Sequence, residues 1–208
     1  MTIIFYDIPS KLAVKSGRPT LESRLRLALN IKGLPYQTVW VEFPNIDRVC
    51  KDIGAKPTDS LEIARYLDNQ YPETIAMFPK GSQALQAAFK EAMSASPWPT
   101  FSLRRMNAPS EHSTFEEEED PKGEARDEQW AKMREGHEII AAWFLKSEES
   151  QFVMGKDVSF ADTMLVAWLR VVGVAYGEES DEWKAVLALQ DGWWARDLKQ
   201  FDQYLAGV

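Results

Sequence analysis

The sequence predicts an α/β plus all-α fold, with a small N-terminal part that mixes strands and helices and a larger part made of helices. Two apolar, β-prone segments flank an amphipathic segment within residues 2–43, which is the pattern of a strand–helix–strand unit. Beyond Pro79, apolar residues recur at helical spacing. We therefore expect a boundary near residues 72–82, with one domain over 1–78 and a second over 82–208.

The N-terminal elements are expected to be a strand, a helix and a second strand. Residues 2–6 are apolar and β-prone, which predicts a buried strand. Thr20 is placed to cap the following helix, and Gly33 is placed to end it. Residues 36–43 are again β-prone. Because a helix separates the two strands, we expect them to pair in parallel.

Two further helices are expected before the boundary. A short one over residues 46–53 contains Cys50, the only cysteine, which we interpret as a packing residue. Asp59 is placed to cap the next helix, with Glu62 three residues on, and Pro72 stops it. A single cysteine excludes an internal disulfide and agrees with a reducing compartment, so we expect the protein to be cytoplasmic.

The larger part is expected to consist of helices only. One of them carries a core stripe at helical spacing from Trp130 to Phe144, which includes His137. Another has a well-defined start, because Ser159 can cap it and Asp162 can bond the N–H of Ser159 in return. We place these helices at residues 82–106, 124–147, 159–176, 180–190 and 193–206.

Composition and charge exclude several classes of function. The net charge is −8, and residues 111–128 hold nine acids and two bases, so the rest of the chain offers no basic field for nucleic acid. No apolar run reaches the roughly 18 residues of a membrane span, and the N-terminus is typical of a strand rather than a signal peptide. His112 and His137 do not make a zinc pattern, and the acidic block lacks the spacing of a calcium loop, so we expect no metal.

The start of the helix at residues 159–176 resembles a family signature. The string Gly-Lys-Asp-Val-Ser-Phe-Ala-Asp over 155–162 is similar to the N-capping box of the glutathione transferase C-terminal domain, although alone it makes only a well-capped helix. With the predicted architecture, it resembles a cytosolic glutathione transferase, which implies a thioredoxin-like N-terminal domain and an all-helical C-terminal domain. The stretches that look closer to the fungal-type, etherase-related class are 5–11, 28–30, 32–36, 38–42 and 59–68.

One departure from the family shortens the N-terminal domain. In the family, a strand with a cis-proline precedes the Asp/Glu-Ser motif and pairs with the cysteinyl part of glutathione. Here residues 55–58 lead almost directly into Asp59 and Ser60, which leaves too little chain for two strands and a turn. We therefore do not assign Pro57 as that proline, and we expect a truncated domain with two evident strands. The region around 107–123 also looks shorter than in the family.

A second departure concerns the group that would activate the thiol of glutathione. The class commonly has Trp-Ser-Pro in the loop before the first helix, where this chain has Lys-Ser-Gly-Arg-Pro-Thr over 15–20. The resemblance makes Ser16 the candidate catalytic residue, since a hydroxyl there would donate a hydrogen bond to the thiolate, and Thr20 is the other hydroxyl nearby. The alternative is that Ser16 is loop and Thr20 only a cap. Tyr6 lies on the strand itself and Cys50 in another element, so neither is favoured.

Asp59 and Ser60 are the candidate glutathione-binding residues. A helix N-terminus offers unpaired N–H groups and positive potential, which suit a carboxylate. The resemblance implies that Asp59 binds the amino group of glutathione, and that Ser60 with its N–H binds the α-carboxylate. The alternative is a capping box alone, formed by Asp59 and Glu62, and the two interpretations are compatible.

An apolar pocket for an electrophile is expected between the two domains. Pro97 and Pro99 are expected to interrupt the helix beside it. The candidates for lining the pocket are Trp98, Phe101 and Trp168, and the alternative is that these rings belong to the ordinary core.

The resemblance leads to three hypotheses of function. The first is a detoxifying enzyme that uses glutathione as co-substrate to conjugate or cleave apolar aromatic electrophiles, with weak activity because two devices of the family are missing. The alternative is a non-catalytic, ligandin-type binder of aromatic small molecules, which the missing cis-proline strand favours. The third is a structural dimerisation module. We expect a homodimer whose partners are glutathione and aromatic small molecules.

Overall fold

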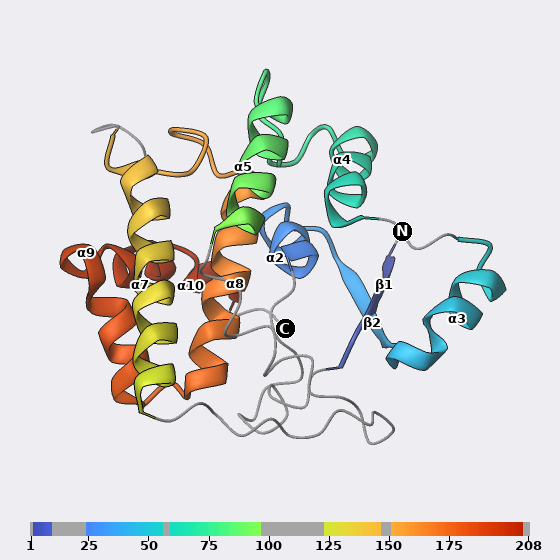
Figure 1. The fold of residues 1–208 in the computed structure, drawn as a ribbon. Coiled ribbons are helices and arrows are strands. Elements are labelled where there is room, and N and C mark those ends of the chain that lie inside the picture. The colour runs from blue at the N-terminus through green and yellow to red at the C-terminus, as the bar shows by residue number, and fades with distance from the viewer. Residues whose placement is uncertain (1, 10–23, 56–58, 97–122, 147–150, 206–208) are drawn as a thin grey trace.

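Two parallel strands with helices beside them form the N-terminal part of the computed structural model, and helices alone form the rest (Figure 1). The structure describes residues 2–9, 24–55, 59–96, 123–146 and 151–205. Its architecture confirms the predicted α/β plus all-α class, with strands and helices in the N-terminal part and helices alone in the C-terminal part.

The strand–helix–strand unit forms as predicted. Strand β1 (Ile3–Asp7) pairs in parallel with β2 (Tyr36–Trp40), and α2 (Arg24–Ile31) is the helix between them in the chain. Gly33 ends α2 in a left-handed conformation, with φ +65°, that places the N–H of Leu34 3.0 Å from the carbonyl oxygen of Leu29. Glycine adopts this conformation without the strain that a Cβ brings.

One face of the sheet is exposed, so the prediction of a buried first strand is wrong for that face. Phe5 and Asp7 contact Arg26 of α2, whereas Ile4 and Tyr6, on the opposite face, are 47% and 40% exposed. The physical reason is the size of the sheet. It has two strands in the described residues, and α2 lies against one side of them.

The covered face of the sheet is held to α2 by Arg26, whose side chain is 2% exposed. Its Nη2 lies 2.9 Å from Oδ2 of Asp7. Its guanidinium group lies over the rings of Phe5, Tyr36 and Trp40, at 5.3–5.6 Å from the ring centroids. A buried cation needs a partner, and here the partners are one carboxylate and three ring faces. They come from both strands, so a single guanidinium group contacts β1 and β2 together. Arg26 therefore fixes α2 across the sheet.

The helices that follow β2 match their predicted positions. A 3-10 turn (Phe43–Asn45) leads into α3 (Ile46–Asp52), which projects from the far side of the strands and has no buried residue (Figure 1). Cys50 on α3 is partly exposed. Helix α4 (Ser60–Gln70) starts at Asp59, whose Oδ1 accepts a hydrogen bond from the N–H of Leu61 at 2.9 Å, so the predicted cap is confirmed. The carboxylate of Glu62 pairs with Arg65 at 2.7 Å.

The C-terminal helices also match their predicted positions. Residues 180–206 were expected to form two helices, and α9 is sharply kinked at residues 189–192, where Gln190, Asp191 and Gly192 have positive φ angles. The predicted part of the first helix beyond residue 96 lies outside the described residues. The observed helices are α5 (Gln83–Ala95), α7 (Glu124–Phe144), α8 (Phe160–Tyr176), α9 (Asp181–Gln200) and α10 (Asp202–Leu205).

Helix α8 lies at the centre of the molecule. It contacts α2 of the N-terminal part as well as α5 and α9, and Figure 1 shows it between these helices. Its apolar residues share one hydrophobic core with Leu27 and Ile31 of α2 and with the stripe on α7. That stripe is confirmed, since Met133, His137 and Phe144 are all buried.

A buried glutamine bonds the start of α8 to the connection between the two parts, which is the segment between α4 and α5 (residues 71–82). Gln86 of α5 donates from Nε2 to the carbonyl oxygen of Met77 at 3.0 Å and to the hydroxyl of Ser82 at 2.9 Å. Its Oε1 accepts from the N–H of Ala161 at 2.9 Å, and the N–H of Phe160 donates to Met77 at 2.8 Å. The first N–H groups of α8 have no partner within the helix, so these bonds satisfy them where water has no access.

The capping box predicted at the start of α8 is confirmed. Oδ2 of Asp162 accepts from the N–H of Ser159 at 2.8 Å and from its hydroxyl at 2.6 Å. Oδ1 accepts in addition from the N–H of Val153 at 2.7 Å, which the sequence does not indicate. Asp162 therefore orders the preceding loop as well as the helix start.

On the N-terminal side of the connection, Asp68 of α4 has a similar role. Its carboxylate accepts from the N–H groups of Met77 and Phe78 at 2.9 and 2.8 Å and from Nζ of Lys32 at 2.8 Å. The ammonium of Lys32, which is buried, also donates to the carbonyl oxygen of Ile75 at 2.9 Å. The connection is thus bonded on one side to α2 and α4 and on the other to α5 and α8.

Asp197 of α9 is a second buried carboxyl group, which electrostatically couples to Asp162. Burial raises the pKa of Asp162 to about 6, although its three hydrogen bonds oppose this shift. Burial and the charge of Asp162 raise the pKa of Asp197 to about 7. Between the ordinary pKa of 3.8 and these raised values, both groups hold protons in the folded state that the unfolded chain has released. Stability from these groups is therefore present near pH 4 and is lost as the pH rises to about 7.

The Gln86 bonds give the first prediction. Gln86→Met keeps the length of the side chain but leaves the N–H of Ala161 buried without its acceptor. We expect the free energy of unfolding in urea to fall by about 2–4 kcal/mol. Gln83→Met, at an exposed position of the same helix, is the matched control and should change it by less than about 0.5 kcal/mol. Equal stability of the two variants would contradict the role given to Gln86.

The buried carboxyl pair gives the second prediction. Asp197→Asn removes a group that must lose its proton inside the protein as the pH rises. We expect the free energy of unfolding to increase by about 2 kcal/mol at pH 8, and the gain to disappear towards pH 4.5. Asp157→Asn, at an exposed position, should show no such pH dependence. A loss of stability at pH 8 would show that the ionised Asp197 carboxylate is favourably bound.

Candidate functional site

The N-terminus of α4 brings together charged groups from three elements. Asp59 is the N-cap and Ser60 the first residue of the helix. Lys90 reaches it from α5, with its Nζ 2.9 Å from Oδ2 of Asp59. Arg24, at the start of α2, acts on Asp59 through its charge. Two cations and one carboxylate therefore surround the end of a helix.

The surroundings of Asp59 keep its carboxylate ionised. The hydrogen bond from Lys90 lowers its pKa most, and burial acts in the opposite direction. The N–H of Leu61 and the charges of Lys90 and Arg24 lower the pKa further. Asp59 is therefore an anion at neutral pH, although its side chain is about half exposed (49%).

This arrangement suits a ligand that carries an ammonium and a carboxylate group close together. The ionised Asp59 accepts hydrogen bonds from an ammonium group, as it does from Lys90. The start of α4 offers N–H donors and positive potential to a carboxylate. The head group of an α-amino acid has both features. The capping role of Asp59 uses Oδ1 for Leu61, which leaves Oδ2 for the interaction with the ammonium of Lys90.

The remaining predicted site residues do not all fall within the described structure. Tyr6 lies on β1 as expected and is partly exposed. Trp168 lies on α8, partly buried, with its ring centroid 5.4 Å from that of His137. Burial lowers the pKa of His137 to about 4, so Trp168 packs against a neutral imidazole. The predicted residues outside the described ranges are Ser16, Thr20, Pro57, Trp98 and Phe101.

Lys90 and Arg24 are the members of the site that sequence reasoning missed. Each is an ordinary cation on a predicted helix, and its position in the helix does not distinguish it from other exposed cations. The only available signal is indirect. A candidate anion-binding helix start with an acidic cap needs cations nearby if it is to favour a negatively charged ligand.

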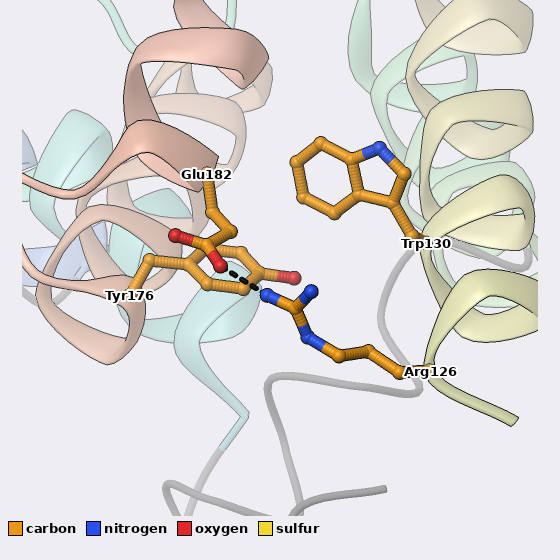
Figure 2. Close-up of a pocket in the computed structure, with 4 residues that line it drawn as sticks. All are labelled: Arg126, Trp130, Tyr176 and Glu182. Carbon is orange, nitrogen blue, oxygen red and sulfur yellow. Dashed lines mark hydrogen bonds and ion pairs between the residues drawn. The ribbon is translucent and has the colours of Figure 1, made fainter. Parts of the chain in front are cut away.

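Two of the hollows in the described part of the chain lie away from this site. The first lies between the ends of α7, α8 and α9, where Trp130 faces Tyr176 at 6.0 Å between centroids and Arg126 pairs with Glu182 (Figure 2). Its volume of about 20 Å³ suits a single water molecule. The second, of about 370 Å³, lies at the opposite end of α4, beside Asp68.

Membrane and metal sites have no support in the described residues. None of the helices over these ranges has the length and apolar character needed to cross a membrane. Within the same ranges, no three side chains of the types His, Cys, Asp and Glu gather closely enough to hold a metal ion. Most of the acidic block at residues 111–128 lies outside them.

Comparison with known proteins gives matches along the whole chain. The family model described as the glutathione S-transferase C-terminal domain matches residues 103–204. A glutathione S-transferase of Ceriporiopsis subvermispora, solved in complex with glutathione, is 32% identical, with a TM-score of 0.87 and 98% of each chain covered. A second from that fungus, also in complex with glutathione, is 29% identical, with a TM-score of 0.85 and 97% of this chain and 98% of the other covered.

A glutathione transferase of Phanerochaete chrysosporium is 30% identical, with a TM-score of 0.82 and coverage of 98% of this chain and 97% of the other. No curated protein sequence matches the chain. The similarity to the solved structures includes the N-terminal part, which the family model does not cover.

Proposed function

The chain belongs to the glutathione transferase family and is similar to its fungal members, and we propose that it binds glutathione at the N-terminus of α4 and directs the thiol at apolar aromatic electrophiles. The observation that carries the proposal is the ionised carboxylate of Asp59 at the start of this helix. Two similar fungal proteins were solved in complex with glutathione, which supports the choice of ligand.

The proposed contacts follow the charges of the site. The γ-glutamyl end of glutathione is an α-amino acid head group with one ammonium and one carboxylate. Asp59 binds the ammonium. Ser60 binds the carboxylate through its hydroxyl and through the N–H groups at the start of α4, where the helix dipole adds positive potential. The protein needs no metal for this function.

The proposed chemistry is nucleophilic attack by the thiolate of glutathione. The sulfur attacks an electrophilic carbon, a carbon–sulfur bond forms, and the bond from that carbon to the leaving group breaks with its electron pair. For an aromatic ether the leaving group is an aryloxide, which then takes up a proton from water. The protein contributes by holding the thiol beside the electrophile and by stabilising the thiolate, for which Ser16 is the proposed hydrogen-bond donor.

The electrophile pocket is proposed to lie between the two parts of the chain, lined by Trp98, Phe101 and Trp168. Aromatic rings of this kind favour flat apolar substrates. We further propose that the protein works as a homodimer in the cytoplasm and takes part in detoxification, as the family resemblance implies.

A second candidate function is non-catalytic binding of aromatic small molecules. The observation that favours it is the short connection between α3 and α4. Helix α3 ends at Asp52 and the cap of α4 is Asp59, which leaves too few residues for the strand that aligns glutathione in the family. A protein without that strand holds the thiol less firmly, so we expect transferase activity to be weak.

Substitutions at Asp59 and Ser60 test the proposed glutathione site by calorimetry. Asp59→Asn retains a good N-cap but removes the charge, so it should weaken glutathione binding about tenfold with little loss of stability. Asp59→Ala should weaken binding and also cost about 1 kcal/mol of stability. Ser60→Ala should weaken binding only. Unchanged glutathione affinity in all three variants would leave Asp59 as a helix cap and nothing more.

A substitution at Ser16 separates the two candidate functions. We expect Ser16→Ala to lower the rate of conjugation of an aryl halide by about 100-fold or more, because the thiolate loses its hydrogen-bond donor. Binding of an aromatic fluorophore should stay nearly unchanged in the same variant. Thr20→Ala is the companion variant, since it removes the other nearby hydroxyl. A wild-type protein that binds the fluorophore but neither binds nor turns over glutathione supports the second function.

A further inference from the structure

The ion pair between Lys90 and Asp59 joins the two parts of the molecule at the proposed glutathione site. Lys90 lies on α5, in the C-terminal part, and Asp59 lies at the start of α4, in the N-terminal part. Nζ and Oδ2 are 2.9 Å apart, and the side chains are 27% and 49% exposed. The pair is therefore open to solvent, and a ligand can reach both of its charges.

The pair places an ammonium group where the proposed site receives the ammonium of its ligand. When glutathione binds, the γ-glutamyl ammonium requires the carboxylate that Lys90 contacts in this structure. The α-carboxylate beside that ammonium then requires a cation. Lys90 can turn from Asp59 towards a carboxylate bound beside it, because its four-carbon side chain moves the ammonium by several ångströms without any movement of α5.

The charge balance favours an exchange of partners over simple displacement. Two cations, Lys90 and Arg24, act on the single carboxylate of Asp59. The local charge is therefore +1, and a bound head group with equal positive and negative charge leaves it unchanged. Expelling Lys90 into solvent would leave the α-carboxylate with the hydroxyl of Ser60 and the helix-end interaction, neither of which supplies a full positive charge.

Stability alone does not account for the ion pair. Exposed ion pairs contribute little to stability, because solvent screens them and two long side chains lose mobility. Among the charged residues of α5, Lys90 is the one whose ammonium group contacts Asp59, the cap of α4.

We propose that Lys90 is a specificity-determining residue that binds the α-carboxylate of the γ-glutamyl group. It completes a site in which Asp59 binds the ammonium, and Lys90 from the other part of the chain joins Ser60 in binding the carboxylate. The inference rests on the proposed function, since it assigns a further residue to the same glutathione site. It also explains why the site selects an α-amino acid head group rather than any amine.

The test compares two ligands by titration calorimetry of the full-length protein. One is glutathione, and the other is 4-aminobutyryl-cysteinylglycine, which is glutathione without the γ-glutamyl α-carboxylate. The variants are Lys90→Met, which removes the charge and keeps the apolar side chain, and Lys90→Arg, which keeps the charge. Lys184→Met is the matched control, because Lys184 is an exposed lysine on α9 that also pairs with a carboxylate, that of Glu179.

We expect Lys90→Met to weaken glutathione binding by about tenfold or more, as for the loss of a charge-assisted hydrogen bond. The decarboxylated analogue should bind the wild type and Lys90→Met with affinities within about twofold of each other. Lys90→Arg should retain most of the affinity, and Lys184→Met should not differ from the wild type. Thermal unfolding of Lys90→Met should stay close to that of the wild type, which excludes a folding defect.

Two results would overturn the inference. Equal loss of affinity for both ligands in Lys90→Met would show that Lys90 does not recognise the α-carboxylate. Tighter glutathione binding in Lys90→Met would show that Lys90 only competes with the ligand for Asp59. Failure of the proposed function gives a different result, because the wild type itself would then not bind glutathione.

Discussion

The N-terminus of α8 is buried, and this constraint organises the rest of the molecule. A helix start has N–H groups without partners in the helix, and water cannot serve them inside a protein core. Here two partners come from other segments, the carbonyl oxygen of Met77 and the amide of Gln86, and the third is the carboxylate of Asp162 in the first turn of α8 itself. Each partner is held by further hydrogen bonds, so the need of one helix end orders the connection, α5 and the loop before α8.

The small N-terminal part depends on this arrangement. Two strands and their helices bury little apolar surface of their own, and one face of the sheet is exposed. Helix α2 compensates because it joins the core of the C-terminal part through Leu27 and Ile31. Arg26 on the opposite face of α2 holds the strands in turn. The proposed ligand site is therefore supported from the C-terminal side through α2.

Local patterns in the sequence predicted the helices, the positions of the strands, the cap at Asp59 and the box at Ser159 and Asp162, because each of these depends on residues close together in the chain. The parallel pairing followed from the helix that separates the two strands. The exposed face of β1 was not predictable from apolar character, since exposure depends on how many strands the sheet has. Lys90 was missed for a related reason. Its partner is 31 positions away, and their contact exists only after α4 and α5 have packed.

The connection over residues 75–78 has a consequence for motion. Asp68 holds the N–H groups of Met77 and Phe78 on one side, while Gln86 and Phe160 bind the carbonyl oxygen of Met77 on the other. A hinge needs backbone dihedral angles that rotate freely, and these bonds lock them. These bonds therefore restrict hinge motion at this connection. For the proposed site, a ligand would therefore be admitted by rearrangement of side chains such as Lys90, which exchanges partners, and not by the opening of one part away from the other.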